Sequence, residues 1–166
     1  MKIDNLQKLY VEELRDLHSA ERQIIQALPR MIKAASSPDL KAAFEEHLEI
    51  TKEQLARLDQ IFDGLGKRGA GKRCKGMEGV IAEGKEMLEE DIAPEVLDAA
   101  LIAAAQHVEH YEIAGYGTAR THAELLGESQ AAKLLQRTLD EEANTDKKLT
   151  ALAQKVNVEA EAPVAV

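Results

Sequence analysis

The sequence has no tryptophan, aromatic residues make up only 3% of it, and it contains a single cysteine. Aromatic and β-branched residues favour strands, so their scarcity argues against a β-sheet protein. The one cysteine, Cys74, cannot form an internal disulfide, which fits a reducing compartment. No segment approaches the ~20 apolar residues of a membrane span, and the first residues start no apolar signal-peptide core. These absences predict a cytoplasmic protein with no membrane partner.

Basic residues are fewer than acidic residues. The 166 residues include 21 Lys and Arg against 30 Asp and Glu, which gives a net charge of −9. A nucleic-acid-binding protein usually carries a basic face, so this charge argues against a nucleic-acid partner. The length fits one domain that can bury a core. Alanine, the strongest helix former, is abundant, and we therefore expect an all-α domain.

Apolar residues at helical spacing predict four long helices and one short helix. Asp4, followed by Gln7, predicts a capping box at the first start. Ser37-Pro38-Asp39 predicts the second start, with a hydroxyl N-cap and proline at N1. The predicted long helices span residues 4–35, 37–63, 94–126 and 129–156, and the short helix spans residues 77–90.

The link between the second and third long helices contains the short helix and a glycine-rich basic loop, residues 64–76. This link is long enough to cross a bundle. One long crossover between two antiparallel helix pairs is the ferritin-like arrangement of a four-helix bundle. We therefore expect a bundle domain over residues 1–156 and a flexible C-terminal tail over residues 157–166.

Acidic residues and one histidine fall on or beside the apolar stripe of each long helix. Burying one uncompensated charge costs several kcal/mol, whereas a whole domain is stable by only ~5–15 kcal/mol. Basic residues are scarce in the middle of these helices, which favours metal cations as the compensating charges. Carboxylates and imidazole from four facing helices form the ligand shell of di-iron or di-manganese bundle sites. The candidate ligands are Glu21, His47, Glu109, Glu112, Glu142 and Asp146.

Each candidate also has a simpler interpretation. Glu21 alone would more often be a solvated residue beside the stripe. His47 alone would more often be a hydrogen-bonded core histidine. The pair on the third long helix could form an exposed acidic face, because that helix has two plausible apolar sides. The pair on the fourth long helix has the strongest case, because the stripe there is unambiguous. Taken together, the residues favour a metal site more strongly than any one of them does.

Several segments resemble one known family. The run AALIAAAQHVEHYEIAGYGT, residues 99–118, is the most specific of them. Four further segments carry the same resemblance: SAERQ at residues 19–23, FEEHLEIT at 44–51, CKGMEG at 74–79 and TLDEEANTD at 138–146. Together these segments are similar to the YciE/YciF family of bacterial ferritin-like stress proteins, and the resemblance covers nearly the whole chain.

The resemblance implies a rubrerythrin-like bundle that forms a homodimer and holds a dinuclear carboxylate site, with two iron ions or, alternatively, manganese. By resemblance the ligand positions are the six candidates named above. Ile50 is a departure, because related chains can carry an acid there, three residues from His47. The loss of that acid weakens the expectation of two bound ions. The chain also lacks the paired cysteines of a rubredoxin domain, so it has no built-in electron donor.

Two functions follow from this pattern. The first is a metal-binding protein whose iron or manganese reacts with oxygen or peroxide in a stress response, with Tyr10, Tyr111 or Tyr116 as candidate electron carriers. The second is a metal-free dimeric bundle that acts as a structural or interaction protein, which Ile50 favours. A DNA-coating ferritin relative is disfavoured, because the only basic cluster is the crossover loop.

Two other motifs in the crossover carry less weight. Residues 66–72, GKRGAGK, fit most of a phosphate-binding loop, but Arg73 stands where a Ser or Thr would bind magnesium, and no strand precedes the loop. Cys74 lies among lysines and arginines, which would favour a thiolate. A thiolate would suit a redox role for Cys74, although a structural role is the simpler interpretation.

Overall fold

The computed structural model describes residues 2–161, and within this range it contains five helices and no strand. The helices are α1 (Leu6–Ala34), α2 (Pro38–Gly64), α3 (Lys75–Met87), α4 (Pro94–Leu125) and α5 (Ser129–Glu161). The chain is therefore an all-α protein, as its composition predicts. The short helix α3 begins two residues earlier and ends three residues earlier than the predicted range of 77–90.

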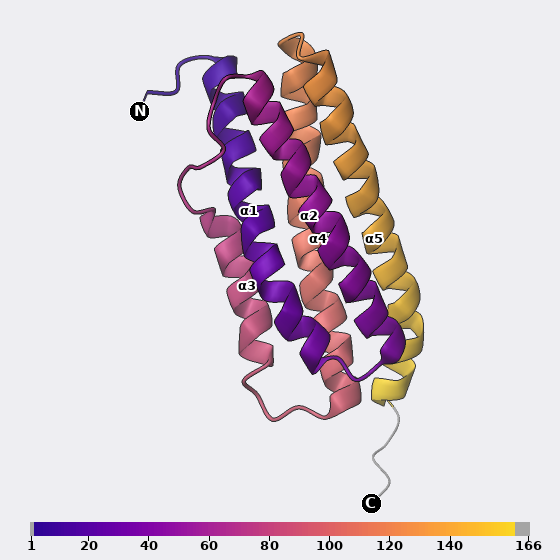
Figure 1. The fold of residues 1–166 in the computed structure, drawn as a ribbon. Helices are drawn as coiled ribbons and strands as arrows, with labels where there is room; N and C mark the ends of the chain where they lie inside the picture. Colours follow the sequence, from indigo (N-terminus) through magenta and orange to yellow (C-terminus); the bar gives the residue numbers. More distant parts are fainter. Residues whose placement is uncertain (1, 162–166) are drawn as a thin grey trace, which may run out of the picture.

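The four long helices form a ferritin-like bundle in which α1 pairs with α2 and α4 pairs with α5 (Figure 1). Contacts of α1 with α4 and of α2 with α5 join the two pairs. The crossover from α2 to α4 contains α3, which packs on the outside of the bundle against α1 and α4. This is the predicted long crossover with a short extra helix. Within residues 2–161, none of the helices combines the length and the hydrophobicity that a membrane span requires.

The helix ends follow local capping chemistry. The N-cap of α1 is Asn5, whose side chain accepts a hydrogen bond from the backbone N–H of Lys8 at 2.9 Å. The prediction that Asp4 caps this helix was wrong by one residue, because Asp4 instead pairs with the Lys8 ammonium group. At the start of α2 the predicted cap is confirmed, since the Ser37 hydroxyl accepts from the backbone N–H of Leu40.

The last helix is longer than predicted. Residues 157–161, assigned to the flexible tail, continue α5 as far as Glu161. Val156 is buried in this last part of the helix, which explains why the helix does not end there. Residues 162–166, the rest of the predicted tail, lie outside the described residues.

A polar layer divides the apolar core into two clusters. One cluster includes Phe44 and Leu101 and lies toward the α1–α2 turn. The other includes Leu14, Leu58 and Tyr116 and lies toward the opposite end of the bundle. His47, Thr51, Gln54 and Arg57 of α2, Glu109 and Glu112 of α4, and Thr138 and Glu142 of α5 fall, in sequence, between the parts of each helix that contribute to the two clusters, and α1 adds the buried Glu21. All four long helices therefore present polar side chains at one level of the bundle.

Candidate metal centre

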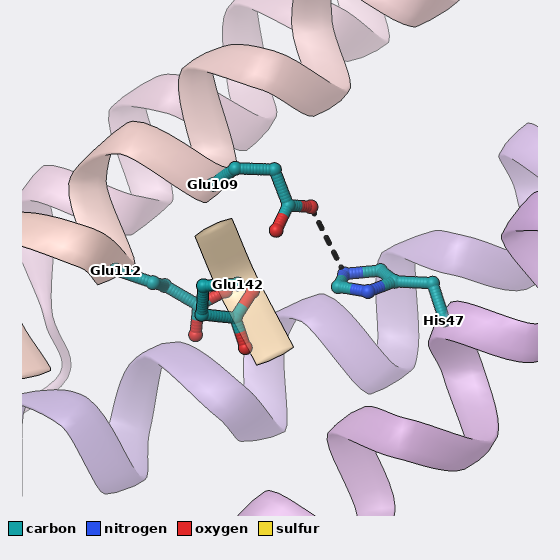
Figure 2. A group of neighbouring side chains, drawn as sticks. All are labelled: His47, Glu109, Glu112 and Glu142. Carbon is teal, nitrogen blue, oxygen red and sulfur yellow. Dashed lines mark ion pairs between the residues drawn. The ribbon is translucent and has the colours of Figure 1, made fainter. Parts of the chain in front are cut away.

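The polar layer contains five of the six predicted metal ligands. The exposed fraction of each of these five residues is 4% or less. Four of them offer ligand atoms that all lie within 4.8 Å of one another (Figure 2). The fifth, Glu21 of α1, lies against the same group. The four-residue group, hereafter the acidic cluster, consists of His47 of α2, Glu109 and Glu112 of α4 and Glu142 of α5.

The helical repeat turns the α4 ligands inward. Glu109 and Glu112 are three residues apart and therefore share one face of the helix. Leu101, Ala105 and Tyr116, which are buried in the core, lie on the same face. The alternative interpretation of these two acids as an exposed acidic surface is wrong, because both carboxylates are buried inside the bundle.

Most polar atoms of this group have no hydrogen-bond partner among the described residues. Both carboxylate oxygens of Glu109 and Glu112, one oxygen each of Glu21 and Glu142, and both ring nitrogens of His47 are unpaired in this sense. His47 Nε2 lies 3.2 Å from Glu109 Oε1, but the two atoms are not oriented as a hydrogen bond. Buried polar atoms are nearly always paired. The atoms of this group are therefore suited to hold a cation.

Burial controls the proton affinity of these groups. Desolvation raises the pKa of Glu21, Glu109 and Glu112 well above the usual carboxyl value, and the negative neighbours raise it further. Desolvation also raises the pKa of Glu142. For His47 the same burial lowers the pKa to about 4. The imidazole is therefore neutral near pH 7 and has a lone pair for a metal, whereas the carboxyls need a nearby positive charge before they ionise.

Two further polar residues of α2 reach this layer, and the sequence analysis did not identify them. The Gln54 side-chain amide donates a hydrogen bond to Glu142 Oε1. The Arg57 guanidinium makes two hydrogen bonds to Glu141, at 2.6 and 2.8 Å, and one to the Thr138 hydroxyl at 3.0 Å. Both residues follow His47 at helical spacing, by seven and ten residues, which is the signal that could have found them.

One tyrosine contacts the layer directly. The Tyr116 hydroxyl donates a hydrogen bond to Glu21 Oε1. Of the other two candidates, Tyr111 bonds Asp16 and Cys74 near the start of α3. Tyr10 belongs to the core cluster nearer the N-terminus of α1. Tyr116 is therefore the tyrosine placed to interact with the acidic cluster.

The structure does not bring Asp146 into the cluster. Its side chain is 21% exposed; Asp146 Oδ1 accepts from the Gln106 amide at 3.0 Å and lies 3.3 Å from His110 Nε2. Asp146 follows Glu142 by four residues, so it lies about 6 Å farther along the helix and is rotated by about 40°. This displacement leaves Asp146 at the edge of the polar layer.

The position of Ile50 bears on the predicted ligand set. Ile50 is partly buried and lines a small cavity of about 20 Å³ together with His47 and Glu109. An acid at position 50 would therefore start beside two members of the acidic cluster. In this chain the position supplies only apolar surface.

Cys74 has a structural environment. It is 1% exposed, and its sulfur atom accepts a hydrogen bond from the backbone N–H of Met77 at the start of α3. The sulfur also lies 3.1 Å from Asp16 Oδ2 and 3.0 Å from the Tyr111 hydroxyl. Burial raises the pKa of the thiol. The idea that neighbouring basic residues favour a thiolate is therefore wrong, because the sulfur faces an acid and the protein interior.

Comparison with known proteins gives relatives over nearly the full length. Residues 5–162 match the family described as "Domain of unknown function (DUF892)". The chain is 47% identical to Protein YciF of Escherichia coli (strain K12) over 163 residues, which cover 97% of this chain and 98% of that protein.

Solved structures agree with these matches. The crystal structure of the E. coli stress protein YciF superposes with a TM-score of 0.90 at 46% identity and covers 93% of this chain and 98% of that one. YcfI of Rhodopseudomonas palustris, described as a proposed structural protein, gives a TM-score of 0.87 at 43% identity and covers 90% and 95% of the two chains. A Xanthomonas campestris protein, XCC3681, shares only the fold, with a TM-score of 0.74 at 19% identity over 93% and 94% of the two chains.

Proposed function

Because this chain belongs to the DUF892 family, whose description assigns no activity, we propose its function from the site itself: it binds two divalent metal ions, iron or manganese, in the acidic cluster. The proposed ligands are His47, Glu109, Glu112 and Glu142, with Glu21 completing the shell. The relation to an E. coli stress protein supports a role in a stress response.

The observation that carries this proposal is the balance of charge in the polar layer. Four carboxylates, from Glu21, Glu109, Glu112 and Glu142, are buried together, and their histidine neighbour is neutral. Arg57, the one buried arginine among residues 2–161, is held by Glu141 through two hydrogen bonds. Two divalent cations would neutralise four carboxylates, whereas one cation would leave half of the negative charge uncompensated. The charge therefore supports a dinuclear site over a mononuclear one.

The donor types indicate which metals fit. Carboxylate oxygens with a single imidazole suit iron and manganese, whereas closed structural zinc sites use cysteine. Iron or manganese in such a shell supplies redox chemistry toward oxygen or peroxide. The chain's own contribution is to hold the ligands in place. Gln54 fixes the Glu142 carboxylate and Tyr116 fixes that of Glu21 through the hydrogen bonds described above.

The central experiment measures metal content per chain in protein purified without chelators, and again after anaerobic loading with Fe(II). We expect about two ions per chain from the charge balance of the site. A single ion per chain would contradict the dinuclear proposal and point to the missing acid at Ile50. Negligible metal after loading would contradict metal binding altogether.

Substitutions assign the ligands. Glu142→Ala removes a carboxylate from the centre of the cluster, so we expect it to abolish tight metal binding while far-UV circular dichroism still shows the helices. The matched control is Asp146→Asn on the same helix, because Asp146 lies outside the cluster. This control should keep the metal content of the unsubstituted protein. Equal metal loss in both variants would show that the cluster as drawn is not the ligand set.

A second function, that of a structural bundle without metal, is favoured by one observation. A relative at 43% identity, YcfI, is described as a proposed structural protein. In that case the buried carboxyls would stay protonated and share protons with one another. The same loading experiment separates the two functions, because a structural bundle would take up no iron or manganese.

A further inference from the structure

The crossover helix covers a second cavity, and apart from His47 and Glu109 none of the residues that line it has a role in the proposed function. This cavity has a volume of about 270 Å³ and lies between α1, α3 and α4. An engineered cavity of about 150 Å³ in another protein holds benzene, so this space is large enough for an organic molecule. Its position follows from the fold, because α3 packs on the outside of the bundle against α1 and α4 (Figure 1).

The walls of the cavity are mostly apolar. Ile24 and Leu28 of α1, Val80 and Ile81 of α3 and Val108 of α4 line it. Such walls bind hydrocarbon by removing it from water, at about 25 cal/mol per Å² of buried apolar surface. The occupant is therefore expected to carry an apolar chain or ring.

The two ends of the cavity differ in charge and exposure. At the inner end it reaches His47 and Glu109 of the acidic cluster, which are almost fully buried. Its exposed charged lining consists of Arg30 of α1, Lys85 of α3 and the ion pair of Arg73 with Glu78, in which Arg73 Nε lies 2.6 Å from Glu78 Oε1. Within residues 2–161, Arg30 has no ion-pair partner closer than 4.0 Å, and Lys85 only approaches Glu89, at 3.7 Å.

We propose that this cavity binds an amphipathic monocarboxylate, such as a medium-chain fatty acid, with its carboxylate at Arg30 and Lys85 and its apolar chain between α1, α3 and α4. Guanidinium groups suit carboxylates through paired hydrogen bonds. The opposite orientation would bury the carboxylate charge beside Glu109, where no basic side chain lines the cavity and the loss of hydration is strongly unfavourable. That the chain end lies beside a metal centre rests on the proposed function, but the binding itself does not need metal.

The test is titration of the metal-free protein with octanoate by isothermal titration calorimetry, with 1-octanol as the neutral probe. We expect one octanoate per chain. Arg30→Gln should weaken octanoate binding about tenfold, because a hydrogen bond to a charged group is lost, and should leave 1-octanol binding unchanged. The matched control is Arg22→Gln, an exposed arginine of α1 that does not line the cavity.

A second variant blocks the cavity itself. Ala27 lines the cavity from α1, and Ala27→Phe should abolish binding of both probes by filling the space. Circular dichroism checks that this variant folds, and Arg30→Gln tests the site if it does not. Failure of octanoate to bind at saturation, undiminished binding to Ala27→Phe, or an equal effect of Arg22→Gln would each overturn the proposal. Because no metal is present, these results are independent of the metal-loading experiment.

Discussion

Ile50 is the residue at which a single substitution is expected to change the metal affinity of the acidic cluster most directly. It lines a small cavity together with His47 and Glu109, two members of the cluster. We expect Ile50→Glu to tighten Fe(II) or Mn(II) binding by about tenfold, because it adds a carboxylate ligand beside His47 and Glu109. Competition with a metal-sensitive dye would measure the change in affinity.

The control for this substitution is Ile50→Gln, which has the same size as glutamate without its charge. It should change metal affinity much less than Ile50→Glu does. If both variants bind metal as the unsubstituted chain does, position 50 is only part of the packing around His47.

At the same scale, Asp98 shows how one buried acid can have no part in metal chemistry. Its carboxylate accepts hydrogen bonds at 2.8 Å from the Ser36 and Ser37 backbone N–H groups and from the Ser36 hydroxyl. It thereby holds the turn between α1 and α2 against α4. We expect Asp98→Ala to lower the free energy of unfolding by about 2–4 kcal/mol without changing metal content. Urea denaturation and metal analysis would measure the two effects.

At the scale of one element, the packing of α3 against α4 depends on the absence of a side chain at Gly76. A Cβ atom at Gly76 would lie 2.6 Å from the Tyr111 ring, which hydrogen bonds to Asp16 and Cys74 hold in place. We therefore expect Gly76→Ala to destabilise the protein by about 1–3 kcal/mol, as overpacking does. Thermal unfolding measures the effect.

Gly79 of the same helix is the matched comparison, because a Cβ atom there would meet nothing within 4 Å. Gly79→Ala should stabilise the protein by about 0.5–1 kcal/mol through helix propensity alone. Equal effects of the two substitutions would show that α3 moves away from α4 easily and that the contact with Tyr111 does not position it.

For the whole molecule, the buried acids predict an unusual pH dependence. Burial raises the pKa of Glu21, Glu109 and Glu112 above the ordinary value of 4.5, so the folded protein holds protons that the unfolded chain releases. The free energy of unfolding of the metal-free protein should therefore fall as pH rises from the ordinary carboxyl pKa toward the raised pKa values of the folded state. His47 has the opposite effect, but only below its ordinary pKa of 6.5, because its folded pKa is about 4.

The measurement is urea denaturation of the metal-free and metal-loaded protein between about pH 6.5 and about pH 8.5. The opposing effect of His47 fades across this interval, because the imidazole of the unfolded chain loses its proton above its ordinary pKa of 6.5. Metal-free protein should lose stability across this interval. Bound metal replaces the protons, so the loaded protein should be more stable and lose less. A flat profile for the metal-free protein would mean that the carboxyls are already ionised and stabilised by the protein alone.

The homodimer implied by the family resemblance stays a prediction, which light scattering would test.

Much of this molecule could be predicted from local patterns. The helical repeat of apolar residues determined five helices, and the length of the crossover determined the bundle type. The same repeat put Glu21, His47, Glu109, Glu112 and Glu142 on or beside the apolar stripes, and it left open an exposed position for Glu21 and for the α4 pair. All five residues are buried. Such patterns can be read from the sequence because the side chains that share a helix face depend only on the spacing along the chain.

Tertiary structure decided what depends on contacts between helices. It joined Gln54 and Arg57 of α2 to acids of α5, left Asp146 at the edge of the polar layer, and placed Cys74 against Asp16 instead of the basic residues beside it in sequence. It also formed the cavity under α3. Spacing within α2 can place Gln54 and Arg57 on the face of His47, but it predicts neither their partners nor the other features. Each of these depends on how far neighbouring helices slide and rotate when their apolar stripes pack together.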